Sequence, residues 1–161
     1  MLISLNRFNR TKQSGISLLE VMLSLSIIAI ILVMATRYFF VASENQNVNK
    51  VRGQIGTVVA GLQNYRNQNA DYTGISMNTL VVGGFVAQTA DVSGAAGSYQ
   101  LNNPWNSPIT VAIASTVNGA IVSTALPTQN DCAALLAGYS SSNGACTSTA
   151  PWTFTVTIGQ P

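Results

Sequence analysis

The sequence predicts an α+β fold, in which a long N-terminal α-helix packs against a C-terminal antiparallel β-sheet and a disulfide-bounded loop lies near the C-terminus. The helix is predicted by apolar residues that recur at helical spacing from about Ser17 to about Asn67. The sheet is predicted by short apolar runs between turn residues after residue 98, and by strict alternation over residues 152–158. Cys132 and Cys146 bracket the loop.

The first half of this helix is long and apolar enough to cross a membrane. Residues 18–35 come close to the roughly 20 residues that span the hydrocarbon layer as a helix. The polar residues among them are Glu20, Ser24 and Ser26. An ionised glutamate in lipid costs on the order of 3 kcal/mol, so it is rarely left without a partner. The sequence therefore predicts a partner for Glu20.

A short cationic leader precedes the apolar run. It contains Arg7, Arg10 and Lys12 and no acidic residue, and such a charge bias holds this end in the cytoplasm. In a secretory signal the cleavage site follows the apolar segment, which is discarded. Here the small residue, Gly15, comes first, so a cut after Gly15 would remove the leader and keep the helix. The mature chain would then begin at Ile16.

These residues resemble the N-terminus of the type IV pilin family and of its close relatives, the pseudopilins of type II secretion. The motif is Ser14-Gly15-Ile16-Ser17-Leu18-Leu19-Glu20, followed by Val21-Met22 and the apolar run, and it covers about the first quarter of the chain. The resemblance implies that a membrane-embedded prepilin peptidase cuts between Gly15 and Ile16 and methylates the new amine of Ile16. It also implies that Glu20 is the assembly acid. Many relatives have Phe at the first mature position and a Pro late in the apolar segment, whereas this chain has Ile and no such Pro.

The same resemblance implies a structural subunit rather than an enzyme. Residues 1–15 would be a cytoplasmic leader, and residues 16–37 would be a transmembrane and filament-core segment. Residues 38–161 would form a periplasmic or extracellular domain. The chain would cross the inner membrane once, and an assembly platform and its ATPase would then extract it into a helical homopolymer outside the cell. Such filaments serve adhesion, motility, or DNA and conjugative transfer, and can bind host or surface receptors. The cysteine-bracketed C-terminal region and the Ile at position 16 look more like type IVb or conjugative pilins.

Three alternatives remain at this point. A pseudopilin would drive secretion through a short periplasmic fibre, so its deletion would stop secretion and leave long filaments intact. A minor pilin or anchored adhesin would display the disulfide loop and be present in few copies. A plain signal anchor would place Glu20 at the membrane edge, where it reaches water.

Composition gives no indication of catalysis or of nucleic-acid binding. Charged residues make up 7% of the chain and His is absent. After removal of the leader, four basic and five acidic side chains remain, a net charge of minus one and no basic footprint. Without His, and with the acids scattered, no catalytic set and no cofactor site can be assembled. Two cysteines without His are too few for a metal site.

The second half of the helix carries an apolar stripe that predicts contact with the sheet: Val48, Val51, Ile55, Val58, Val59, Leu62 and Tyr65. Lys50 and Arg52, with other polar residues between the members of the stripe, suit a solvated or subunit-facing side. Gly53, Gly56 and Gly61 each cost up to about 1 kcal/mol in a helix relative to Ala. Close approach of the sheet and mere tolerance of small residues both explain them.

The rest of the chain predicts one modest domain. A short helix is expected near residues 77–82, and strands are expected around residues 98–101, 109–114 and 120–123. The pair Asn118-Gly119 favours a tight hairpin turn between the last two strands. Trp105, in the turn Asn103-Pro104-Trp105, is either a packed residue or a carbohydrate-binding aromatic, and packing is the more frequent case.

The two cysteines predict a disulfide, because the leader sends them to an oxidising compartment. The bond would close a loop of about 15 residues, for which the chain-entropy estimate is about 3 kcal/mol. Cys132 falls in a short helix expected at residues 131–139, with Thr128 or Asn130 as its cap. In type IV pilins such a loop lies on the filament surface and contributes to subunit or receptor contacts, and the resemblance implies the same here.

Overall fold

The structure is a computed structural model that describes residues 15–139 and 143–159 of the 161-residue chain. Contacts within the chain divide it into two compact units, Met1–Ala42 and Ser43–Pro161. One helix, α1 (Leu18–Gln68), contributes residues to both units. The predicted helix is confirmed, with each end within one residue of its expected position.

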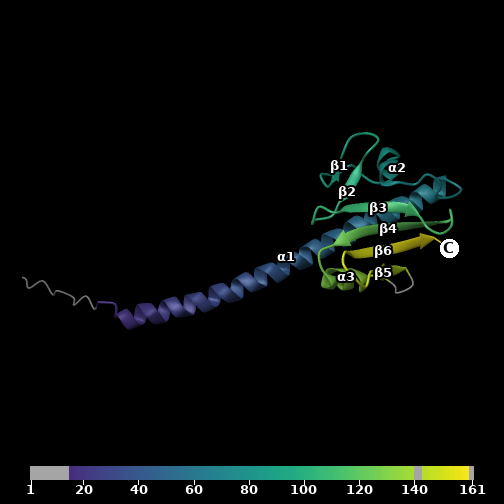
Figure 1. The fold of residues 1–161 in the computed structure, drawn as a ribbon. Coiled ribbons are helices and arrows are strands. Elements are labelled where there is room, and N and C mark those ends of the chain that lie inside the picture. The colour runs from purple at the N-terminus through teal and green to yellow at the C-terminus, as the bar shows by residue number, and fades with distance from the viewer. Residues whose placement is uncertain (1–14, 140–142, 160–161) are drawn as a thin grey trace, which may run out of the picture. The chain divides into compact units, whose positions relative to one another are not determined.

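The second unit contains a six-stranded antiparallel sheet with the order β1-β2-β3-β4-β6-β5 (Figure 1). The strands are β1 (Val92–Ser93), β2 (Gln100–Asn102), β3 (Pro108–Ile113), β4 (Gly119–Leu126), β5 (Gly144–Cys146) and β6 (Trp152–Gly159). Two short helices accompany them, α2 (Met77–Val82) and α3 (Gln129–Leu136). The predicted α+β class is confirmed.

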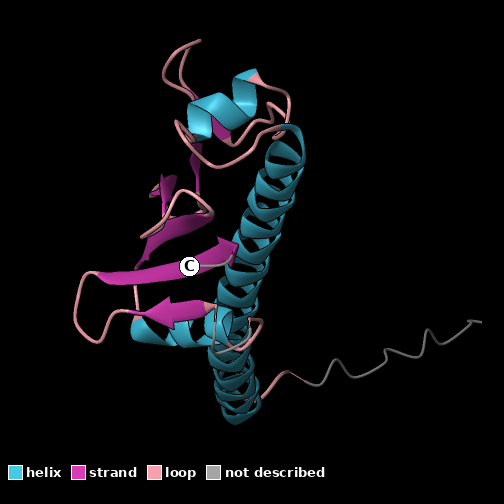
Figure 2. Cartoon of the chain, turned by 90° about the vertical axis from the view of Figure 1, so that its right-hand side faces the viewer, coloured by secondary structure: helices cyan, strands magenta, loops and turns pink. Residues whose placement is uncertain are grey.

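The core lies between one face of the sheet and the part of α1 in this unit (Figure 2). The α1 stripe is buried at Val48, Val51, Ile55, Val58 and Leu62, while Val59 and Tyr65 are partly buried. Alternate residues of β4 and β6 face this stripe, among them Val122 and Phe154. Apolar residues recur about every 3.6 positions along the helix and at every second position along the strands, so the two sets pack against each other in one apolar core.

The hairpin between β3 and β4 differs from the prediction. Its turn is centred on Val117 and Asn118, because the Gly119 amide donates to the carbonyl of Thr116 at 3.1 Å. Gly119 itself already lies in β4, where it pairs with Gly159. The expected turn was therefore wrong by one residue, since Gly119 is needed in the strand rather than in the loop.

The edge strands β1 and β5 were not predicted. Each has two or three residues, and each pairs with only one neighbour, β1 with β2 and β5 with β6. A segment this short has too little alternation to indicate a strand. Both edges are short, which limits pairing with other chains.

Candidate processing and assembly site

The predicted cleavage site lies just before α1 and is exposed. Gly15, Ile16 and Ser17 are outside the helix, and Ile16 is 75% exposed. A Cβ built on Gly15 would meet no atom within 4 Å. The backbone between Gly15 and Ile16 is thus accessible within the described chain. The predicted leader up to Ser14 lies outside the described residues.

Ser17 is the residue just before α1, and it provides the first backbone acceptor of the helix. Its carbonyl accepts hydrogen bonds from the amides of Glu20 and Val21, at 2.9 and 3.2 Å. Glu20 is therefore the third residue of α1, in the first turn, where the unpaired amides of a helix favour a negative charge. Ser17 and Glu20 have the spacing of a capping box, but neither side chain forms its hydrogen bond among the described residues. Within residues 15–139 and 143–159 the Glu20 carboxylate has no hydrogen-bond partner, so it can accept a bond from elsewhere.

The other polar side chains of the apolar segment are satisfied by the helix itself. The hydroxyl of Ser24 donates to the carbonyl of Glu20 at 2.8 Å, and that of Ser26 to Leu23 at 2.7 Å. Thr36 donates to the carbonyl of Val33 at 3.0 Å. Such bonds allow a hydroxyl to lie in an apolar environment. In the described part of this segment, Glu20 is left as the side chain that needs an outside partner.

The apolar segment itself is uncovered in the isolated chain. It is long and apolar enough to cross a membrane, and none of the qualifying stretch is buried. Leu18 is 78% exposed and Met34 is 64% exposed. Exposed apolar surface of this extent marks a membrane or protein interaction site.

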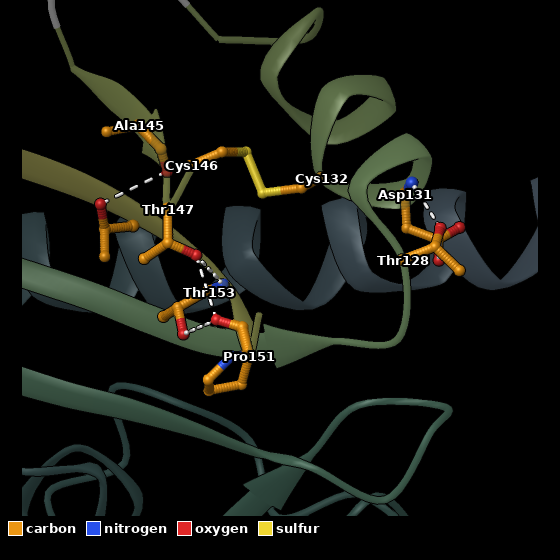
Figure 3. Close-up of a disulfide and its surroundings, with 9 residues drawn as sticks. Thr128, Asp131, Cys132, Ala145, Cys146, Thr147, Pro151 and Thr153 are labelled. Atoms are coloured by element: carbon orange, nitrogen blue, oxygen red, sulfur yellow. Dashed lines mark hydrogen bonds between the residues drawn. A yellow bond between two sulfur atoms is a disulfide. The ribbon is translucent and has the colours of Figure 1, made fainter. Parts of the chain in front are cut away.

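The predicted disulfide is present. Cys132 and Cys146 are joined by an S–S bond of 1.98 Å, and it ties α3 to β5 (Figure 3). Cys132 is fully buried in the core. Next to it, Thr128 caps α3: its hydroxyl accepts from the amide of Asp131 at 3.2 Å and donates to the Asp131 carboxylate at 2.7 Å. Of the two caps considered, Thr128 is correct and Asn130 is not. Ser140, Ser141 and Ser142 of the bracketed loop lie outside the described residues.

Two cations expected on a solvated or subunit-facing side of α1 also hold other elements of the domain: Lys50 is exposed as expected, and Arg52 is half-buried. The Lys50 ammonium forms an ion pair with Asp91 at 2.8 Å, and this hydrogen bond lowers the pKa of Asp91. The Arg52 guanidinium donates to the carbonyl of Ala134, near the end of α3, at 2.7 Å. It also lies against Gly138, where a Cβ would come within 2.6 Å of the guanidinium. The sequence pattern missed both roles because the partners are far away in the chain.

The turn around Trp105 is structural. The buried Asn103 carboxamide accepts from the amides of Trp105 and Ser107, at 3.0 and 2.9 Å. Its amino group donates to the hydroxyl of Thr124 and the carbonyl of Ala125, at 3.0 and 2.8 Å. Trp105 is partly buried against the core. The geometry therefore favours the packing interpretation over a carbohydrate site.

Comparison with known families gives a match to the prokaryotic N-terminal methylation motif over residues 10–36. The matched segment contains Gly15, Ile16 and Glu20, and it is a signature of type IV pilins. The chain therefore has the N-terminal segment of a type IV pilin-like protein, which in general terms implies processing by a prepilin peptidase and filament assembly. No curated protein and no solved structure gave a significant match.

Proposed function

We propose that this chain is the structural subunit of a type IV pilus. In this role it enters the inner membrane, is cut between Gly15 and Ile16, and then polymerises through α1. The observation that carries the proposal is the combination at the start of α1: an accessible glycine bond, an uncovered apolar helix, and Glu20 as the side chain in need of a partner. The family motif over residues 10–36 supports the same role.

Hydrolysis of the bond between Gly15 and Ile16 would add water across the peptide and leave a carboxylate on Gly15 and an amine on Ile16. The α-amino group has an ordinary pKa of about 7.7–8.0, so it is largely protonated at neutral pH. Transfer of a methyl group to this nitrogen from a sulfonium methyl donor forms an N–C bond, breaks the C–S bond of the donor, which leaves as a thioether, and releases one proton. The product is a secondary amine that still binds a proton. Because Ile16 and Ser17 lie outside the helix, the amine can turn toward a neighbouring copy.

In the filament, the Glu20 carboxylate of one copy would pair with the Ile16 amine of the next. Removal of one partner from a buried ion pair leaves an unpaired charge and costs about 3–5 kcal/mol. A register that separates the two groups is disfavoured by a similar amount. The pair therefore selects the axial position of each added subunit.

Purification of surface fibres tests this role. Fibres sheared from cells should consist mainly of this chain, beginning at Ile16 and carrying one methyl group on its amine, a net gain of CH2 in intact-mass analysis. An uncut chain confined to the membrane fraction would contradict the proposal. Deletion that leaves long filaments intact and stops the secretion of other proteins would identify a pseudopilin instead.

Glu20 is tested by a pair of matched variants. Glu20→Ala should be cleaved normally but give few or no fibres. Ser24→Ala is the control, because its hydroxyl bonds only to the same helix, and it should give fibres at the unsubstituted level. Equal fibre yield from Glu20→Ala and Ser24→Ala would refute the charge pairing.

A further inference from the structure

Four residues at the outer end of the apolar segment combine a cation with aromatic rings. Arg37 is followed by Tyr38, Phe39 and Phe40, which are 83%, 71% and 70% exposed. The rings of Phe39 and Phe40 meet edge to face, with centroids 6.3 Å apart. The sequence pattern missed this group, since it ended the apolar run at residue 35.

The four side chains surround the helix. Consecutive residues of an α-helix are turned by about 100°, so positions 37–40 point to all sides. A single protein partner contacts one side of a helix, whereas a membrane interface contacts every side. Tyr and Trp are enriched at such interfaces, where an aromatic body and a polar tip meet lipid and water.

The spacing along the helix fits the thickness of a bilayer. Residues 18–36 rise about 28 Å at about 1.5 Å per residue, and the hydrocarbon core is about 30 Å thick. With Arg37 at the outer boundary, Glu20 lies close to the inner boundary and Gly15 at the inner surface. Arg37 borders two shallow hollows, one with Ile30, Val33 and Met34 and one with Tyr38 and Val41. Its stem can therefore lie on apolar surface while the guanidinium reaches lipid phosphates.

We propose that a membrane anchor is formed by Arg37, Tyr38, Phe39 and Phe40. This anchor binds the lipid headgroups on the outer, non-cytoplasmic side of the inner membrane, and so sets the depth of the bond between Gly15 and Ile16. This inference rests on the membrane insertion in the proposed function. The anchor acts before assembly. It holds the scissile bond at the inner surface, where a membrane-embedded peptidase can reach it.

Depth measurements on the full chain in vesicles of phosphatidylethanolamine and phosphatidylglycerol test the anchor. Cys132 and Cys146 are bonded to each other, so a fluorescent maleimide reacts only with an introduced cysteine. Probes at Thr36→Cys, Ser26→Cys and Ser17→Cys report the outer end, the interior and the inner end. Spin-labelled lipids that quench at known depths locate each probe.

The decisive variant replaces Tyr38, Phe39 and Phe40 together by Leu, which keeps the segment apolar and helical but removes the aromatic rings. The anchor predicts that the Thr36→Cys probe moves toward the bilayer centre by about 4.5 Å, the rise of three residues. The matched control replaces the same residues by Trp and should leave the depth unchanged. Circular dichroism checks that each variant keeps its helix and sheet.

Each other outcome has a definite meaning. If the Leu variant keeps its depth, the aromatic rings do not set the position and the anchor is refuted. If the depth is kept but energy transfer between labelled copies falls, the aromatic group is a contact between copies and the anchor is again refuted. If lipid quenchers do not reach the Ser26→Cys probe in the otherwise unsubstituted chain, the membrane insertion fails, and with it the proposed function.

Discussion

Gly61 is the helix glycine at which the structure requires the absence of a side chain. It is buried on α1, and a Cβ added there would lie 2.9 Å from the carbonyl oxygen of Phe85 and 2.9 Å from a methyl carbon of Val86. The amides of Phe85 and Val86 both donate to the carbonyl of Leu80, at 2.9 and 3.1 Å. This segment is therefore held in place and cannot move away cheaply.

The substitution Gly61→Ala should destabilise the domain. Overpacking of a well-packed core costs about 1–3 kcal/mol, and the better helix propensity of Ala returns up to about 1 kcal/mol. Gly56 provides the matched control in the same helix. It is exposed and a Cβ there meets nothing within 4 Å, so Gly56→Ala should gain up to about 1 kcal/mol. The difference between the two variants, about 1–3 kcal/mol, isolates the contact.

Urea unfolding of the full chain in detergent, followed by the fluorescence of Trp105 and Trp152, measures both free energies of unfolding. The midpoint should fall for Gly61→Ala and hold or rise for Gly56→Ala, with unchanged slopes. If Gly61→Ala is as stable as Gly56→Ala, the approach at Phe85 is not rigid and the reasoning is wrong.

Three further predictions concern the domain. Arg52→Met should lower the free energy of unfolding of the domain by about 1.5–3 kcal/mol, the contribution of a charged hydrogen bond. Lys50→Met should lower it by at most about 1 kcal/mol, because the ion pair of Lys50 is exposed. Equal losses for the two variants in urea titrations would contradict this prediction. Replacement of Cys132 and Cys146 by Ser should cost about 3 kcal/mol by the chain-entropy estimate, and a thermal scan that does not distinguish this variant from the native chain would contradict it. The lowered pKa of Asp91 means that its pairing stabilises the domain above the ordinary carboxyl pKa, and this contribution is lost as the pH falls through the lower folded-state pKa. The free energy of unfolding, measured from neutral to acid pH, should therefore fall less for Asp91→Asn than for the unsubstituted chain.

Local signals in the sequence were enough for the elements that form by their own pattern. The helical period predicted α1, and the alternation over residues 152–158 predicted β6. Thr128 was one of the two caps predicted for α3, because capping depends on residues within one turn, and the structure selects it over Asn130. The short strands β1 and β5 were not recognised, since only pairing with β2 and β6 makes them strands. Secondary structure that depends on tertiary contacts has no sequence period of its own.

The candidate site divides in the same way. Gly15, Ile16 and Glu20 form a local motif, so the sequence was enough to predict a processing and assembly site there, and that site stays a prediction. The cysteine pair was also predicted from the sequence and is confirmed. The role of Arg52 was not found, because its acceptor, the carbonyl of Ala134, lies 82 residues further along the chain. The sequence pattern placed Tyr38, Phe39 and Phe40 after the apolar run and assigned them no role. The anchor was inferred from the exposure of their side chains in the structure.

The polar groups of α1 bear on what drives assembly under the proposed function. Lipid tails are as apolar as Leu, so exchanging lipid for neighbouring helices around residues 18–36 yields little hydrophobic free energy. The hydroxyls of Ser24, Ser26 and Thr36 already bond within the helix, so they gain no new partner on assembly. If the proposal is right, Glu20 is the group of this segment whose surroundings change most, from a carboxylate near the inner membrane boundary to an ion pair inside the filament. Specificity for the filament would then depend on Glu20, while the apolar surface would make both environments acceptable.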